Sequence, residues 1–395
     1  MEPKVAPSAF GLRLVCDEPF RVFFPLGLTC GLVGVSHWIL YGMGWVEQYS
    51  CFYHGLVQIQ GFQVCFIVGF LMTALPKFLE VPAARPYELF LSLGFVLAGL
   101  VCLTLERWTV AELSFVALIL HTILFAARRF RRRKDRPPDE FVFILFGFLC
   151  ALAGGLALLA TATAETGRRL VEQGMTLSFI MGIGGFLIPR LLGHAARVPE
   201  GMSAEAVRRT AEASRGARIA LYALTGVLLL SSFVVEAVVE GPAGKLLRAA
   251  VVTAHFLRVI RVHRAPRRKM WHVRFLRLSL YLTMAGLWLS GLFPDYEVAA
   301  LHLMFVGGFS LITLSIGVRV VVSHCGFGAL WDRNPAPVVA FGALFLAALG
   351  LRVGADLYPD AYFPLLALAA GCWSAGALVW GVYFVPKMRG VDTPE

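Results

Sequence analysis

The residues in this sequence most able to do chemistry are ionisable side chains within strongly apolar segments. The clearest case is the segment 301–326, LHLMFVGGFSLITLSIGVRVVVSHCG, which is long enough to cross a bilayer. It nevertheless contains His302, Arg319 and His324. Because an ionisable group in hydrocarbon is costly, each of these residues is by default a candidate functional residue.

Histidine gives these segments their distinctive chemistry. A neutral imidazole is a good ligand for iron and copper, and haem iron needs only one or two axial ligands from the helices packed around the macrocycle. Zinc needs three or four converging ligands. Several membrane histidines on different helices therefore suit haem better than zinc. The alternative for each histidine is an ordinary packing or hydrogen-bonding role.

The composition places these segments in a membrane protein. Of the 395 residues, 58% are hydrophobic and 15% are charged, whereas about 25% are charged in a typical soluble domain. This composition excludes a soluble protein. Apolar windows of about 20 residues predict twelve membrane-spanning helices. These lie near 22–43, 53–75, 87–105, 109–128, 140–163, 170–190, 217–238, 246–263, 273–293, 298–322, 336–355 and 361–385.

The loops predict the orientation of these helices. Basic loops alternate with acidic or nearly neutral ones, which places both termini in the cytoplasm and requires an even number of spans. The net charge of +11 therefore reflects topology and does not indicate a nucleic-acid partner. We also expect no cleaved signal peptide.

We predict an all-α, polytopic membrane protein with about twelve helices in one bundle. The chain is expected to form a single domain over residues 1–395, in which the linker 197–218 joins two sets of six helices.

On this topology the candidate histidines lie at three depths. Three are at the outer ends of their spans: His37, His54 and His302. His121 and His255 are near mid-membrane and form a possible second pair. His324 lies at the inner end, about 33 Å along the helix from His302, so one metal centre cannot use both residues.

Two of the candidate features allow two interpretations each. Arg319 either pairs with a propionate, an anion or a carboxylate, or extends towards the inner interface. One face of the second span consists of polar and small residues. This face either admits a cofactor or packs closely against another helix. This face consists of His54, Gln58, Gly61, Cys65 and Gly69.

Three segments together resemble a known family. They are HGLVQIQGFQVCFIVGFLMTALPKF, MGIGGFLIPRLLGH and LHLMFVGGFSLITLSIGVRVVVSHCG. In this order, on a chain of this length, they resemble the NnrS family of bacterial membrane proteins. The third segment carries most of the specificity, through Leu301–His302, Val306–Gly307, Thr313–Leu314, Arg319 and the sequence from His324 to Gly326.

The resemblance implies a function. It implies a protein of the bacterial inner (cytoplasmic) membrane that binds haem and copper and acts in the response to nitric oxide, in nitrosative stress or denitrification. Four residues of this sequence match the family's motif positions directly: His54, His302, Arg319 and His324. We therefore expect haem b, with His54, His302 and His324 as candidate metal ligands. The remaining candidate cofactor-binding residues are Arg319, His37, His121 and His255.

The sequence departs from the family pattern at two motifs. Where the family commonly has H-x-H-E, this chain reads His54, Gly55, Leu56, Val57, so the second histidine and the glutamate are absent. Where the family commonly has G-G-R-V-I-P, residues 184–189 read GGFLIP. These departures weaken the expectation of copper more than that of haem.

Three functions remain open from the sequence. The first is a haem protein that binds nitric oxide, as a sensor, scavenger, protector or enzyme. The second is an oxidase or nitric oxide reductase of the haem–copper class, which the absence of any His-His pair disfavours. The third is a metal-free transporter with an anion or small-molecule path, for which the glycine-rich sixth span and Arg319 are suitable.

Overall fold

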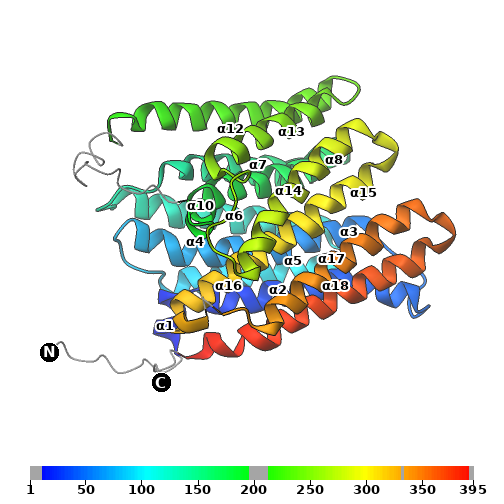
Figure 1. The fold of residues 1–395 in the computed structure, drawn as a ribbon, viewed down its shortest axis with the longest axis horizontal. Helices are drawn as coiled ribbons and strands as arrows, with labels where there is room; N and C mark the ends of the chain where they lie inside the picture. The colour runs from blue at the N-terminus through cyan, green and yellow to red at the C-terminus, as the bar shows by residue number, and fades with distance from the viewer. Residues whose placement is uncertain (1–10, 195–211, 331–332, 391–395) are drawn as a thin grey trace.

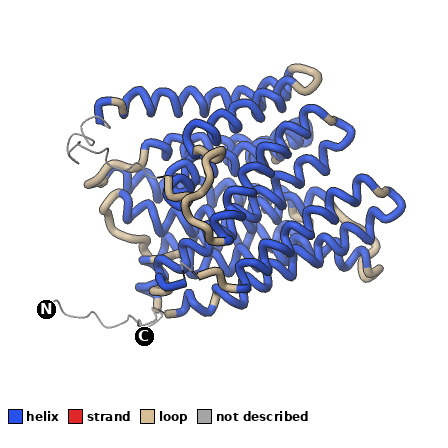
Figure 2. The backbone as a smooth tube through the Cα atoms, viewed as in Figure 1, coloured by secondary structure: helices blue, strands red, loops and turns tan. Residues whose placement is uncertain are grey.

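The computed structural model describes residues 11–194, 212–330 and 333–390. In these ranges every regular element is a helix and no strand occurs, as Figure 2 shows. The prediction of an all-α polytopic membrane protein is confirmed. The chain ends, and residues 197–211 of the expected linker 197–218, lie outside the described residues.

Eleven helices in the described residues are long and apolar enough to cross a membrane. They are α2 (Phe20–Gly42), α3 to α4 (Cys51–Phe78), α5 (Pro86–Thr104), α6 (Trp108–Arg131), η2 to α7 (Asp139–Ala157), η3 to α10 (Thr161–Leu191), α12 (Arg215–Val238), α14 (Trp271–Leu292), η7 to α16 (Pro294–His324), α17 (Ala336–Leu357) and η10 to η11 (Pro359–Arg389).

The remaining predicted span, the eighth, is also helical but less apolar. It consists of α13 (Ala243–His255) and the π-helical segment η6 (Phe256–Ile260), and it contains Lys245, Arg248 and Arg258. It packs between α12 and α14 (Figure 1). With this helix, the described chain passes along the bundle twelve times.

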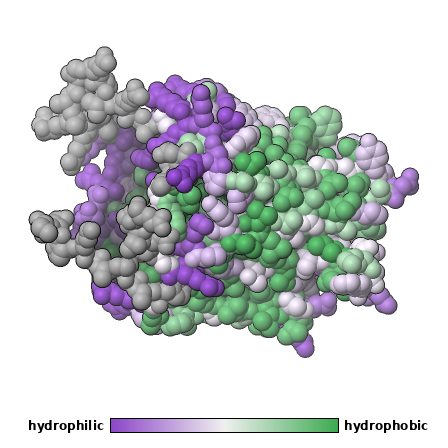
Figure 3. Space-filling view, turned by 60° about the horizontal axis from the view of Figure 1, so that its bottom comes forward, coloured by the Kyte–Doolittle hydropathy of each residue, from purple (hydrophilic) through white to green (hydrophobic). Residues whose placement is uncertain are grey.

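The two ends of the described chain lie at the same end of the bundle, as an even number of passes requires (Figure 1). The Arg21 Nη1 atom, near the start of α2, donates a hydrogen bond to the carbonyl of Met388 at 2.6 Å. We call this end the inner end and the opposite end the outer end. Figure 3 shows hydrophilic side chains gathered at the inner end beside a broad hydrophobic surface, which suits contact with lipid.

The sixth crossing begins earlier than predicted. The sequence predicted a start at 170, but the helix extends outward to Thr161. Its outer turns are charged and would be costly alone, but Glu165 accepts hydrogen bonds from Arg168 and Arg169. These internal ion pairs explain why an apolar window placed the start too late.

Several crossings contain short π-helical segments, in which the backbone takes one extra residue per turn. π-helical turns are rare and occur frequently at functional sites. The segments are η1 (Val57–Gln63), η4 (Leu170–Met175), η5 (Ile180–Gly184), η6 and η8 (Leu303–Ser310). They divide α3 (Cys51–Leu56) from α4 (Val64–Phe78), α8 (Ala164–Arg169) from α9 (Thr176–Phe179), α9 from α10 (Gly185–Leu191), and α15 (Glu297–His302) from α16 (Leu311–His324).

A close helix contact fixes the helix that carries His302. A Cβ atom added at Gly286 of α14 would lie 2.7 Å from the carbonyl oxygen of Ala300 and 2.9 Å from the backbone nitrogen of Met304. Both neighbours are backbone atoms on either side of His302, so they cannot move independently of the helix. Glycine at 286 therefore sets how closely α15 and η8 approach α14.

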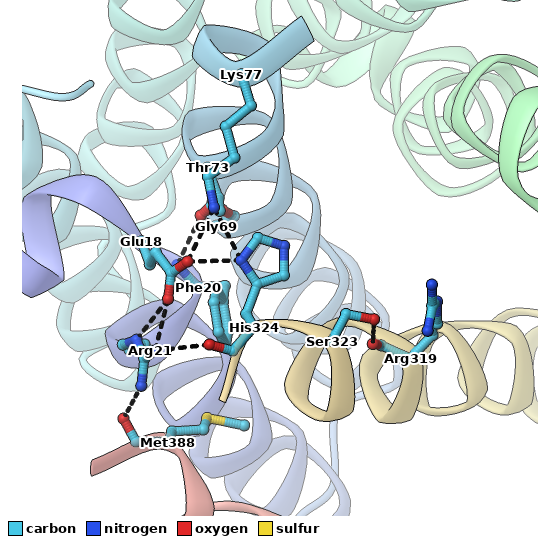
Figure 4. A network of polar contacts seen from close by, with 10 residues as sticks. All are labelled: Glu18, Phe20, Arg21, Gly69, Thr73, Lys77, Arg319, Ser323, His324 and Met388. Carbon is cyan, nitrogen blue, oxygen red and sulfur yellow. Dashed lines mark hydrogen bonds and ion pairs between the residues drawn. The ribbon is translucent and has the colours of Figure 1, made fainter. Parts of the chain in front are cut away.

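Four helix ends meet at the inner end in one polar network around Glu18 (Figure 4). The carboxylate of Glu18 lies 2.6 Å from His324 Nδ1, 2.8 Å from Lys77 Nζ and 2.6 Å from Arg21 Nη2. The four residues lie at the start of α2, the end of α4 and the end of α16. Through Arg21 and Met388 the network also reaches the segment after α18 (Tyr362–Phe384). Charge-assisted hydrogen bonds of this kind are stronger than neutral ones.

We predict that Gly286→Ala destabilises the protein by about 1–3 kcal/mol, because the added methyl group overpacks a backbone contact. Gly350→Ala is the matched control, since Gly350 lies in α17 with no atom within 4 Å of an added Cβ. In detergent, Gly286→Ala should lower the midpoint of thermal unfolding while Gly350→Ala leaves it unchanged or slightly higher. Equal midpoints for the two variants would contradict the role given to Gly286.

We further predict that the Glu18 network weakens in acid. Burial alone would raise the pKa of Glu18, but hydrogen bonds from His324, Lys77 and Arg21 lower it from 4.5 to about 2. A lowered pKa means that the stabilisation is complete above about pH 4.5 and is lost as the pH falls towards 2. Glu18→Gln should therefore reduce thermal stability at pH 7 and remove the part of the acid sensitivity that arises in this interval.

The matched control is Glu80→Gln, because Glu80 is an exposed carboxylate shortly after α4. Thermal unfolding of the wild type and both variants between pH 7 and pH 3 is the measurement. If Glu18→Gln and Glu80→Gln follow the same profile as the wild type, the network does not contribute to stability.

Candidate functional site

The outer end of the bundle contains a cavity of about 510 Å³. This volume falls within the range of about 300–1,000 Å³ that is usual for ligand sites. Its walls come from α2, α3, the charged outer part of the sixth crossing, α15 with η8, α17 and α18. Aromatic side chains dominate its apolar lining, among them Trp38, Phe62, Phe309 and Trp373.

Two of the predicted ligands, His54 and His302, line this one cavity. His54 Nδ1 lies 2.8 Å from the carbonyl oxygen of Gly34, and His302 Nδ1 lies 2.7 Å from that of Val298. A carbonyl oxygen can only accept a hydrogen bond, so Nδ1 is the protonated nitrogen of each ring. The lone pair of Nε2 is then available in both residues, which is the usual arrangement of a metal-ligating histidine.

The two helices that carry these histidines are joined below the cavity. Thr313 Oγ1 of α16 donates a hydrogen bond to Gln63 Oε1 of η1 at 2.7 Å, and Gln63 itself lines the cavity. The contact fixes the relative height of the two crossings. It therefore also limits how far His54 and His302 can move apart.

Three of the π-helical segments line the cavity. The segment η1 contributes Gln58 and Phe62, η4 contributes Glu172, and η8 contributes Phe305 and Phe309. Each π turn shifts the side chains that follow it around the helix axis, so that residues outside a regular helical stripe can face the same space. The cavity thus depends on local helix geometry that a regular 100° spacing does not describe.

Charged side chains from two crossings also line the cavity. Arg168 donates hydrogen bonds to Glu165 and, at 3.3 Å, to Glu172. A Cβ atom added at Gly55 would lie 2.6 Å from Glu172 Oε1, so the carboxyl group lies directly over the turn that carries His54. On the side formed by α17, Arg352 Nη1 donates a hydrogen bond to Asp356 Oδ1 at 2.9 Å.

The sequence interpretation missed these charged residues. Arg352 lies alone near the outer end of an apolar span, so the rule applied to Arg319 would have identified it as well. Arg168 and Glu172 were visible in the sequence as charges near the predicted start of the sixth span. The ion pairs that Arg168 makes with both Glu165 and Glu172 could not be recognised while the helix was expected to begin at 170.

The other predicted site residues lie outside the cavity. His37 Nε2 accepts a hydrogen bond from the backbone N–H of Ser50 at 3.1 Å, and its ring stacks on Tyr53. This histidine holds the loop between α2 and α3. Its Nε2 already accepts this bond and the residue does not line the outer cavity, so the assignment of His37 to the cofactor stays a prediction.

The structure does not bring His121 and His255 together as a second pair. His121 Nε2 lies 3.1 Å from the carbonyl oxygen of Glu88 in α5. His255 Nε2 lies 3.2 Å from that of Met181, and its ring contacts Phe143. Each ring packs against its own set of helices, and equal depth from the sequence gave no information on lateral position.

The structure places His324 and Arg319 at the inner part of the bundle. The Nδ1 atom of His324 faces Glu18 and Lys77, so this residue belongs to an ion-pair network, and its assignment as a metal ligand stays a prediction (Figure 4). Arg319 points away from that network, and its carbonyl oxygen accepts a hydrogen bond from Ser323 (Figure 4). Neither residue lines the outer cavity.

Most of the small face of the second span packs against α2. A Cβ atom at Gly61 would lie 2.8 Å from the Cβ of Cys30, and one at Gly69 would lie 2.6 Å from the Cβ of Phe23. Gln58 Nε2 donates to the carbonyl of Gly31 at 2.8 Å and also lines the cavity. The face thus packs against α2 along most of its length and lines the cavity at its outer end, through His54 and Gln58.

A family model described as NnrS protein matches residues 14–391, which is nearly the whole chain. No curated protein matches the chain.

Proposed function

The chain belongs to the NnrS family of nitric-oxide-response membrane proteins, and from this premise we propose that its outer cavity holds a haem to which nitric oxide binds. The observation that carries the proposal is the position of His54 and His302. They come from different crossings, line one cavity, and use Nδ1 for a backbone carbonyl while Nε2 stays available.

The residues of the cavity suit a large, flat and mostly apolar group. The lining is rich in Phe and Trp side chains, which can contact a macrocycle on both faces. The two carbonyl groups hold the imidazole rings in fixed orientations, so ordering the ligands on binding costs little. If a ferrous haem were bound there, it would supply an iron that can bind nitric oxide.

We propose haem in preference to copper for this chain. A haem iron needs one or two protein ligands, and the cavity offers two imidazoles. Copper sites in proteins draw on larger sets of histidine and cysteine ligands. In the part of the chain that the structure describes, no group of three or more His, Cys, Asp or Glu side chains is gathered in a way that could hold a metal ion.

We also propose that the protein resides in the bacterial inner membrane with the cavity towards the outside. The support comes from the basic loops, which lie at the end opposite the cavity and would remain in the cytoplasm. Nitric oxide is small and apolar and dissolves in lipid. A site within the outer half of the bilayer therefore meets it directly.

Our prediction for the ligands concerns the visible spectrum. The protein purified in mild detergent should show a haem spectrum in the reduced-minus-oxidised difference, and nitric oxide should perturb it. His54→Ala and His302→Ala should each lower the haem content several-fold, because each removes an available Nε2 from a residue that lines the cavity. His121→Ala is the control, since His121 bonds to the carbonyl of Glu88 outside the cavity.

The possible outcomes separate the open functions. A folded preparation that remains colourless after haem is supplied during expression would refute the proposal and favour a transporter. If His54→Ala and His302→Ala both retain the full haem content, the haem binds at another site.

Our prediction for orientation uses a natural thiol. Cys51 is exposed at the outer end, at the start of α3. In intact spheroplasts a membrane-impermeant maleimide should label Cys51, and Cys51→Ser should abolish that label. A cysteine introduced at Arg389, at the inner end, should react only after the membrane is opened. The reverse pattern would place the cavity on the cytoplasmic side.

A further inference from the structure

We propose that Arg352 binds a carboxylate of the molecule in the outer cavity, and thereby selects haem with free propionate groups. The inference rests on the proposed function, because it takes haem as the occupant. It concerns a residue that neither the family resemblance nor the spacing of the sequence indicated.

Arg352 combines burial with unused hydrogen-bond donors. Its side chain is only 9% exposed, and it lines the cavity from α17. Among the described residues it makes one hydrogen bond, from Nη1 to Asp356. A guanidinium group has five N–H donors, so most of those of Arg352 make no bond within the described protein. Since the side chain lines the cavity, an occupant of the cavity is the natural partner of the remaining donors.

The position of Arg352 relative to the histidines supports this partner. The guanidinium group lies within electrostatic reach of both His54 and His302. A molecule whose iron is held by either imidazole would thus lie beside Arg352. A carboxylate in such an apolar space is costly unless a cation pairs with it, and arginine can pair through two parallel hydrogen bonds.

The second arginine of the cavity does not have this capacity. Arg168 donates to both oxygens of Glu165 and to Glu172, so its charge and its donors are committed within the protein. Arg168 and Arg352 line the same cavity but differ in the partners they already have. This difference provides a matched control within the site.

The inference also reassigns a role expected from the sequence. A pairing with a propionate was one interpretation of Arg319, which lies at the inner part of α16, away from the cavity. Arg352 lies at the level of the two histidines. If a propionate is bound, Arg352 is the residue placed to hold it.

The experiment compares haemin with haemin dimethyl ester, which has the same iron and ring but no free carboxylate. Full-length protein purified without supplied haem is titrated with each compound and followed by absorbance. The wild type should bind haemin about tenfold more tightly than the ester, as the loss of one charge-assisted hydrogen bond implies. The Arg352→Gln variant should bind haemin about tenfold more weakly than the wild type does, and it should bind the ester with unchanged affinity. The difference between the affinities for haemin and for the ester should therefore disappear.

Two further variants keep the test decisive if Arg352→Gln does not fold. Asp356→Asn removes the only hydrogen-bond acceptor of Arg352 among the described residues, and it should preserve or enlarge the preference for haemin. Arg168→Gln should preserve the preference for haemin, because Arg168 is already paired. Loss of the preference in Arg168→Gln but not in Arg352→Gln would overturn the inference.

Failure of the inference can be distinguished from failure of the proposed function. If the wild type binds neither compound, the haem proposal fails. If it binds both equally, haem binds but its carboxylates are not recognised, and the inference fails alone. If the ester-loaded wild type changes its spectrum with added acetate or nitrite and Arg352→Gln does not, Arg352 serves a free anion, which also overturns the assignment to propionate.

Discussion

The absence of hydrogen-bond partners in hydrocarbon is the constraint on which the rest of this structure depends. Every polar side chain inside the bundle must find its partner within the protein. Arg129 illustrates the solution, since its guanidinium binds both carboxylate oxygens of Glu88, at 3.1 and 2.8 Å, and lies over the ring of Phe125. The Glu18 network at the inner end follows the same principle. A few buried polar atoms elsewhere among the described residues also lack a partner, such as Thr176 Oγ1 and Ser315 Oγ. The unused donors of Arg352 and the available Nε2 atoms of His54 and His302 differ from these, because all three residues line one cavity.

The outer cavity depends on irregular helix geometry around it and on close helix packing beside it. The π-helical segments η1, η4 and η8 turn side chains towards one space that regular helices would not share. Away from that space, glycines allow backbones to approach closely, as Gly286 does beside η8. The segments η5 and η6 are also π-helical but do not line this cavity. A tightly packed bundle can contain such local irregularities and keep a cavity open without becoming unstable as a whole. The close helix contacts therefore help to preserve the geometry of the π-helical segments that line the cavity.

The sequence predicted the features that depend on composition and on distance along a helix. Apolar windows identified the crossings, and loop charges identified which ends lie together. The rise per residue placed His54 and His302 at one level and excluded His324 from it. The sequence could not show which helices are neighbours, so it paired His121 with His255 and grouped His37 with the ligands. It also underestimated charged turns, because a window average penalises Glu165, Arg168 and Glu172 individually although Arg168 pairs with both carboxylates.

The segment 301–326 shows how one helix serves both requirements. Its inner end is fixed, because His324 contacts Glu18 and Arg21 at the start of α2 and Lys77 at the end of α4, and it cannot move without breaking these contacts. Its outer end is locally π-helical and carries His302 at the cavity wall. Since Thr313 ties the middle of the helix to Gln63, motion at the outer end is confined to the turns above that bond. The ionisable residues of this segment thus have opposite roles: His324 is stabilised by complete pairing, whereas His302 is useful because its pairing is incomplete.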